Sequence, residues 1–164
     1  MGNNYTIISS VKYDATGKLW LLNSLGDNSI LSFDQTTQEW KHYPHSEIGS
    51  NDRYNLTGLI IGKNNGNIWF ANNYYEKNRL YKYNYNTDEL TMYGPTFTNE
   101  DGRDITPIYV HCLAEDRNGN IWIGTDNGIS LAAHNPSIRS RSLFDITGSD
   151  EGCQISSIQR TVDS

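Results

Sequence analysis

A short phrase that ends in tryptophan occurs three times in the chain at nearly constant spacing. Its copies are residues 14–20, 63–69 and 116–122, and each carries a glycine three positions before the tryptophan. The repeated pairs are Gly17 with Trp20, Gly66 with Trp69, and Gly119 with Trp122. The first two tryptophans are 49 residues apart and the last two are 53 apart. Self-similarity at such a period is the signature of a repeat architecture, so we expect an array of similar units rather than a compact catalytic domain.

Each repeat predicts four short strands. The strands are rich in Ile, Val, Tyr, Trp and Thr and are bounded by Gly, Asn and Asp, and no window shows an apolar face with helical period. The expected strands include residues 7–13, 29–33, 39–43, 79–83, 89–93, 108–114, 120–125 and 128–132. Four strands per unit, at a period near the ~40–50 residues of known propeller repeats, favour an all-β fold made of β-propeller blades.

The glycine and the tryptophan of each phrase have different predicted roles. Asp at the first turn position can hydrogen-bond its own backbone, and Gly at the fourth tolerates positive φ, which closes a tight hairpin. We therefore predict positive φ at Gly17, Gly66 and Gly119. The tryptophans hold the same place in every repeat, so we interpret them as packing between blades rather than as sugar-stacking platforms.

The array is expected to be incomplete. Blade-like repeats cover about 5–44, 54–94 and 107–147, and residues 153–164 resemble the first strand of a further blade because 155–158 repeat the pattern of 8–11. A closed propeller has roughly 4–8 blades. We therefore expect a fragment whose partners are the remaining blades of a parent propeller, or one that self-associates through its open edges.

Composition excludes several classes of partner. Thirteen basic and nineteen acidic residues give a net charge of −6, without the Lys/Arg cluster that nucleic acid needs. No apolar run approaches the ~18 residues of a membrane span, and no signal peptide is visible, so we expect any native leader to lie outside this chain.

The chain contains two cysteines, Cys112 and Cys153, which are either a disulfide pair or two free thiols. We favour free thiols, and this interpretation leaves the redox compartment open.

Residues 110–129 resemble the two-component-regulator propeller repeat. The sequence Val110-His111-Cys112-Leu113-Ala114-Glu115-Asp116 leads through Asn118-Gly119-Asn120-Ile121-Trp122-Ile123-Gly124-Thr125 to Gly128-Ile129, which matches the repeat pattern throughout. The first two repeats are degenerate copies; Lys63, for example, replaces the aspartate. The resemblance implies the periplasmic sensor of a hybrid histidine kinase, in a family that often responds to glycans.

A second resemblance concerns the flanks of the third repeat. Residues 97–105, 109–116 and 134–137 are similar to the propeller protein of the type IX secretion system, which sits at the cell surface near the sortase and is thought to handle anionic lipopolysaccharide. Either resemblance implies a cell-envelope protein of the Bacteroidetes kind, periplasmic or on the cell surface. Neither supplies catalytic residues within these blades, although the parent protein of the first would be a kinase.

Local motifs for chemistry are weak. Residues 116–120 begin like a calcium loop, but the twelfth position is Asn127 instead of a carboxylate, so we interpret them as a turn. His42 and His45 have metal-like spacing without a nearby ligand cluster, and Glu100-Asp101 is interpreted as a solvated loop. Asn55-Leu56-Thr57 fits a glycosylation sequon, which matters only in a eukaryotic secretory pathway. We predict no metal, no cofactor and no enzyme activity; a propeller lyase or hydrolase is the last alternative.

Two predicted loops carry the candidate binding residues. The loop at 72–78 contains Tyr74, Tyr75 and Glu76, and the long connection at 94–106 contains Arg103 and Asp104. Both emerge on the same face of a propeller, where rigid strands would present them to a ligand. We predict a non-catalytic ligand-sensing or interaction module, with an oligosaccharide or lipopolysaccharide as its ligand. Ordinary solvated loops are the alternative interpretation of these residues.

Overall fold

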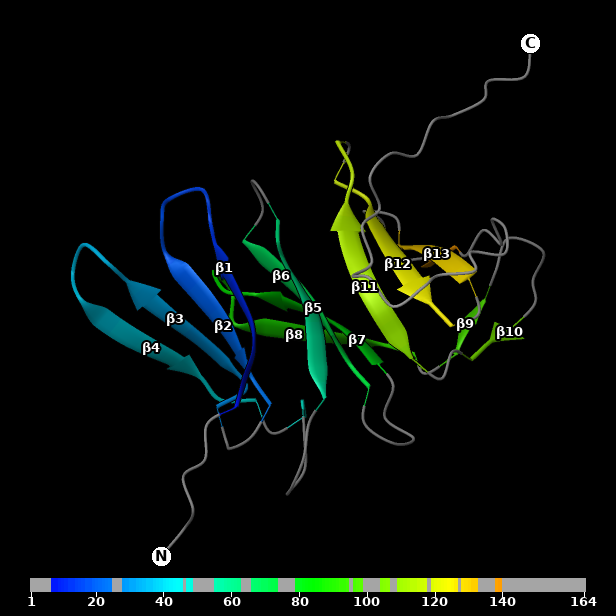
Figure 1. Ribbon diagram of the computed structural model, residues 1–164, viewed down its shortest axis with the longest axis horizontal. Helices are drawn as coiled ribbons and strands as arrows, with labels where there is room; N and C mark the ends of the chain where they lie inside the picture. The colour runs from blue at the N-terminus through cyan, green and yellow to red at the C-terminus, as the bar shows by residue number, and fades with distance from the viewer. Residues whose placement is uncertain are drawn as a thin grey trace, which may run out of the picture.

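The computed structural model describes residues 7–24, 28–45, 47–48, 55–62, 66–73, 79–94, 96–98, 104–106, 109–117, 119–126, 128–132 and 138–139. All regular structure in this part of the chain is β-strand, which confirms the predicted all-β class (Figure 1). Within these ranges no helix is long and apolar enough to span a membrane.

The strands form three four-stranded antiparallel sheets, each a propeller blade in chain order. The first blade is β1 (Ile8–Tyr13), β2 (Leu19–Asn23), β3 (Ile30–Asp34) and β4 (Glu39–Tyr43). The second is β5 (Leu56–Ile61), β6 (Asn67–Asn72), β7 (Arg79–Asn84) and β8 (Glu89–Tyr93). The third is β11 (Val110–Glu115), β12 (Ile121–Thr125), β13 (Gly128–Ala132) and β14 (Ile138–Arg139). Hence the strands predicted from alternation and turn residues are present.

A short hairpin in the connection between the second and third blades was not predicted. It pairs β9 (Phe97–Thr98) with β10 (Asp104–Ile105), and β9 lies beside β14. Two-residue strands produce no detectable alternation, so the sequence carries no period-2 signal for them.

The first strands of the blades lie side by side. β5 contacts both β1 and β11, which places the three together along the inner edge of the array (Figure 1). Each of these strands has a bulge near its start, where the register with the second strand shifts. In β5 the bulge contains Gly58, with φ of 71°, and a Cβ there would lie 3.0 Å from Leu113 Cγ of β11. The bulge therefore allows a close approach of neighbouring inner strands.

The interface between the first two blades is the larger apolar cluster. The first blade contributes Trp20, Leu22, Ile30 and Tyr43, all at most 5% exposed. The second blade contributes Leu56, Leu59, Ile68, Phe70, Tyr81 and Tyr83, all at most 2% exposed, and Ile48 of the connection is fully buried beside them. Rings join across the cluster, with Trp20 stacked on Tyr43 at 5.3 Å and tilted against Tyr85 at 4.8 Å. Such aromatic pairs add to the stabilisation from buried area.

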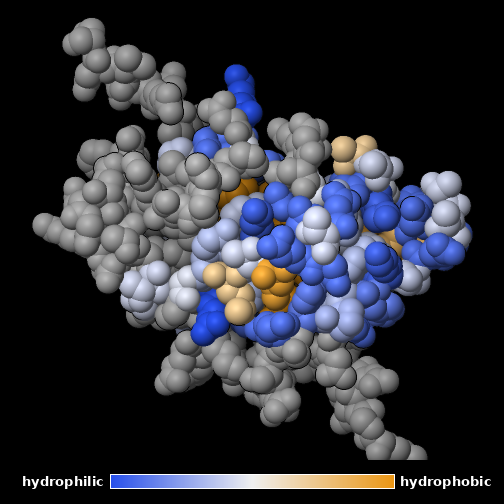
Figure 2. Space-filling model, turned by 180° about the vertical axis from the view of Figure 1, so that it is seen from behind, coloured by the Kyte–Doolittle hydropathy of each residue, from blue (hydrophilic) through white to orange (hydrophobic). Residues whose placement is uncertain are grey.

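The interface between the second and third blades repeats this arrangement. Trp69, Ala71 and Leu80 of the second blade pack with Val110, Ile121 and Ile123 of the third. Trp69 stacks on Tyr93 at 5.7 Å, as Trp20 stacks on Tyr43. Trp20 and Trp69 therefore fill the space between blades, as predicted. The outer surface is mostly hydrophilic with small apolar patches on the side shown in Figure 2.

The turn between the first two strands of a blade has the predicted conformation. Gly17, Gly66 and Gly119 have φ of 85°, 69° and 79°. A residue with a side chain would be strained at such a positive φ, which explains why glycine occupies the position. A second recurrent turn joins the third and fourth strands, where Gln38 and Asp88 both have φ of 59°.

Cys112 corrects one expectation. It lies on β11 and is disulfide-bonded, so the favoured interpretation of it as a free thiol is wrong. Cys153, the other cysteine of the chain, lies outside the described residues. Disulfides persist in oxidising compartments such as the periplasm and the cell surface.

Candidate functional site

The aspartate of the repeated phrase holds both its turn and the tryptophan. In the first blade, Asp14 Oδ1 accepts hydrogen bonds from the Lys18 N–H at 3.0 Å and from both the N–H and the hydroxyl of Thr16, while Asp14 Oδ2 accepts the Trp20 indole N–H at 2.9 Å. Burial works against ionisation of this carboxyl, but these hydrogen bonds outweigh it and hold the pKa of Asp14 below its ordinary value.

The third blade repeats the same clasp. Asp116 accepts the Asn120 N–H at 2.9 Å and the Trp122 indole N–H at 3.2 Å, and the Gly119 N–H donates to the Asp116 carbonyl at 3.2 Å. The oxygens that resembled the start of a calcium loop are thus used to close a turn. In the second blade the position is Lys63, which lies outside the described residues.

A latch of hydrogen bonds connects the first blade to the second and the second blade to the third. The residue four positions after the tryptophan bonds to the first residue of the following inner strand: Ser24 Oγ accepts the Leu56 N–H at 3.2 Å, and Asn73 Oδ1 accepts the Val110 N–H at 2.8 Å. The Asn73 amide also donates to the Val110 carbonyl at 2.7 Å. Asp126 holds the corresponding position in the third blade, but it accepts the N–H of Tyr109, which directly precedes β11 of the same blade.

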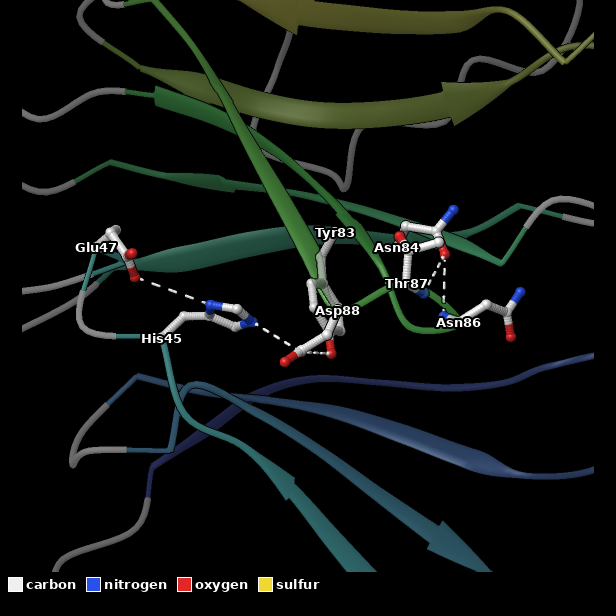
Figure 3. A network of polar contacts seen from close by, with 7 residues as sticks. All are labelled: His45, Glu47, Tyr83, Asn84, Asn86, Thr87 and Asp88. Atoms are coloured by element: carbon white, nitrogen blue, oxygen red, sulfur yellow. Dashed lines mark hydrogen bonds and ion pairs between the residues drawn. The ribbon is translucent and has the colours of Figure 1, made fainter.

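A polar network joins the connection after the first blade to the outer hairpin of the second (Figure 3). His45 Nε2 lies 3.4 Å from Asp88 Oδ1, and His45 Nδ1 lies 3.8 Å from Glu47 Oε2. His45 Nε2 is buried and makes no hydrogen bond, so the contact with Asp88 is an ion pair only when the imidazole is protonated. The Tyr83 hydroxyl donates to Asp88 at 2.7 Å. Burial and this hydrogen bond to a carboxylate raise the pKa of Tyr83.

The contacts around His45 and Asp88 are those of a structural network. The imidazole packs edge-on against the Tyr83 ring at 4.9 Å, and Asn84 accepts the Asn86 and Thr87 N–H groups to close the hairpin that carries Asp88 (Figure 3). Among the described residues, no group of three His, Cys, Asp or Glu side chains is arranged to hold a metal ion. The contacts therefore join the connection after the first blade to the second blade, and no local pattern in the sequence predicts a pairing of residues so far apart.

The predicted binding residues can be placed only in part. Tyr74, Tyr75, Glu76 and Arg103 lie outside the described residues, and Asp104 belongs to β10. Hydrogen bonds hold Asn72 and Asn73, the residues that precede the two tyrosines. The Asn72 amide donates to the Ile48 carbonyl at 3.2 Å, and Asn73 forms the latch to Val110. The ligand-binding role of the loop residues stays a prediction.

The outward face of the first blade contains a hollow of about 380 Å³. Its lining is apolar on the sheet and polar at the rim: Ile8, Leu21, Asn23, Asn28, Leu31, Trp40 and His42. Trp40 is 55% exposed and packs on Phe33 at 4.8 Å.

One segment of the chain matches the model of a known family. Residues 104–127 match the family model described as the two-component regulator propeller, a span that covers β10, β11 and β12. None of the curated proteins matches the chain significantly.

Solved structures resemble the chain over most of its length. PorZ, described as an essential bacterial surface component of the type-IX secretion system of Porphyromonas gingivalis, has a TM-score of 0.67 at 19% identity, covering 86% of this chain and 22% of PorZ. The extracellular domains of two putative hybrid two-component systems from B. thetaiotaomicron have TM-scores of 0.59 and 0.55 at 15% and 20% identity, covering 89% and 84% of this chain. The chain spans 17% of each of those two. At these identities the likeness shows a common propeller fold.

Proposed function

We propose that this chain is part of the extracytoplasmic sensor propeller of a two-component system and acts there as a non-catalytic, ligand-sensing module. The observation that carries the proposal is the match of residues 104–127 to the two-component regulator propeller, on a blade whose aspartate–tryptophan clasp recurs in the first blade. The disulfide at Cys112 supports an oxidising compartment.

The placement of polar groups favours loops over blades as the ligand surface. Asp14 and Asp116 hold turns and indoles, and Ser24 and Asn73 hold neighbouring blades together. These side chains serve the scaffold. A rigid scaffold of this kind presents its connecting loops to ligands. The loop at 72–78, based on Asn72 and Asn73, is the part that we assign to an oligosaccharide.

Binding can be tested by thermal unfolding of the chain with a panel of purified oligosaccharides. A ligand at about a hundred times its dissociation constant stabilises by about 2.7 kcal/mol, which corresponds to a rise in Tm of about 5–10 °C for a chain of this size. Tyr74→Ala combined with Tyr75→Ala should abolish the shift. Tyr13→Ala, which removes an exposed tyrosine from the first blade, is the matched control and should retain it. No shift with any oligosaccharide would refute the proposed ligand class, and an unchanged shift in the double variant would refute the assignment of the site to this loop.

The second candidate is a cell-surface propeller component of the type IX secretion system. The likeness to PorZ, with its TM-score of 0.67, favours it. Here the proposed ligand is anionic lipopolysaccharide, and Arg103 is the residue expected to contact its acidic groups. Binding of purified lipopolysaccharide that weakens with salt and with Arg103→Ala, without binding of neutral oligosaccharides, would select this function over the sensor.

A further inference from the structure

Arg79, the first residue of β7, carries a buried polar atom that has no partner. Its Nε is buried and makes no hydrogen bond, and Nη1 reaches only the sulfur of Met92, a weak acceptor, at 3.8 Å. No carboxylate in the described part of the chain forms an ion pair with the guanidinium. A buried charged donor without an acceptor is costly, so Arg79 calls for an acceptor that the described residues do not supply.

The neighbours of Arg79 on the same side of the sheet cannot neutralise its charge. Asn72 pairs with Arg79 across the strands, but its amide donates to the Ile48 carbonyl and its oxygen accepts the Asn55 N–H. The Tyr81 hydroxyl donates to the same Ile48 carbonyl at 3.5 Å. Burial raises the pKa of Tyr81, an effect that the charge of Arg79 and a hydrogen bond with Asn72 only partly offset, so this hydroxyl stays neutral.

The other blades show that the scaffold needs no cation at this position. Counting along the third strand from the residue opposite the tryptophan places Ser29 and Gly128 at the position of Arg79. Both are small residues. The second blade also has a neighbouring blade on each side within this chain, since β5 contacts both β1 and β11. The surroundings of Arg79 are therefore set inside the array and not at either end of it.

The guanidinium is within reach of a ligand. Arg79 is half-buried as a whole, and Met92, which its Nη1 contacts, is 42% exposed on β8. Nε is thus enclosed while the Nη1 end of the side chain lies at the surface. In the sequence, Arg79 directly follows the loop at 72–78. A guanidinium presents a planar fork of donors that matches the two oxygens of a carboxylate.

We propose that Arg79 binds the carboxylate of an acidic oligosaccharide, which makes uronic-acid sugars the ligand class of this module. The inference rests on the proposed function, in which the loop before Arg79 contacts an oligosaccharide. One unpaired cation at the end of that loop matches one negative group on the ligand. A neutral sugar leaves the guanidinium unpaired when it covers the site, so the site discriminates against it.

Titration calorimetry of the whole chain tests the inference with a panel of uronic-acid oligosaccharides, oligogalacturonate and oligomannuronate among them. Each is compared with the same oligosaccharide after reduction of its carboxyl groups, which should bind at least about tenfold more weakly. Arg79→Gln should weaken binding of the acidic form at least about tenfold and remove the preference for it. Arg79→Lys should fall between, because lysine keeps the charge without the fork. Arg117→Gln makes the same charge change at an exposed residue between β11 and β12, and this matched control should bind as the wild type does.

Unfolding curves of the free variants separate binding from a structural role. Arg79→Gln should match the unfolding temperature of the wild type, because the guanidinium has no charged partner among the described residues. A fall in stability together with equal loss of acidic and reduced oligosaccharides would show a structural role and overturn the inference.

The binding results also distinguish this inference from the proposed function. Equal binding of acidic and reduced oligosaccharides, or full binding of the acidic form by Arg79→Gln, overturns the inference and leaves the proposed function standing. Loss of acidic binding in Arg79→Gln but not in the double variant of Tyr74 and Tyr75 supports the inference and refutes the assignment of the site to the loop. Absence of binding by every oligosaccharide overturns both.

Discussion

Replacing Asp14 by alanine tests whether the clasp on the repeated tryptophan stabilises the blade. The substitution removes the acceptor of the Trp20 indole N–H, which belongs to a side chain only 1% exposed. An unsatisfied buried donor costs about 1–3 kcal/mol, and the lost turn bonds to Thr16 and Lys18 add less because water replaces them, which gives about 2–4 kcal/mol in total. The measurement is the free energy of unfolding from urea titration, followed by tryptophan fluorescence.

Asp34→Ala is the matched control for this prediction. Asp34 also closes a turn, accepting the Thr36 N–H at 2.9 Å and the Thr37 N–H at 3.4 Å. Both of these partners are backbone groups, and neither is an indole. Its loss should cost about 0.5–1 kcal/mol because its partners are exposed backbone groups. If Asp34→Ala destabilises as much as Asp14→Ala, or if Asp14→Ala is neutral, the indole clasp is not the stabilising element.

The pH dependence of stability supplies an independent check. The pKa of Asp14 is lower in the folded chain than the unfolded value of about 3.9, so folding favours the carboxylate. Its contribution is complete above the unfolded pKa and is lost as the pH falls through the folded pKa. Asp14→Asn should therefore lose less stability than wild type on acidification below about pH 4. A parallel decline of the two proteins would contradict the assignment.

Further predictions concern the core, the turns and the disulfide, each measured as a free energy of unfolding. Trp20→Ala should cost about 3–5 kcal/mol, and Trp122→Ala should cost less because its indole is half-buried; the reverse order would contradict the structure. Gly17→Ala and Gly66→Ala should each cost about 1–2 kcal/mol, since both glycines have positive φ and the exposed Asn86 side chain beside Gly66 can move aside; no loss at either position would argue against this. Cys112→Ser should lose about 2–4 kcal/mol, and a reductant should have no further effect on that variant.

The repeat, the strands and the turns could all be predicted from the sequence. Alternation of apolar residues and the glycine before each tryptophan act over a few neighbouring residues, so their effect on local conformation is legible in the chain. Positive φ at Gly17 and Gly119 and the burial of Trp20 follow from that local pattern.

The contacts between blades could not be predicted from the sequence. The pairing of His45 with Asp88, the latch from Asn73 to Val110 and the disulfide of Cys112 depend on the twist and packing of whole sheets. The exposure of Trp40 has the same origin. Its position in the first blade corresponds to Leu90, which is packed against the core in the second blade because another blade lies over it. Local sequence specifies the face of a strand, but the neighbouring sheet specifies whether that face is buried.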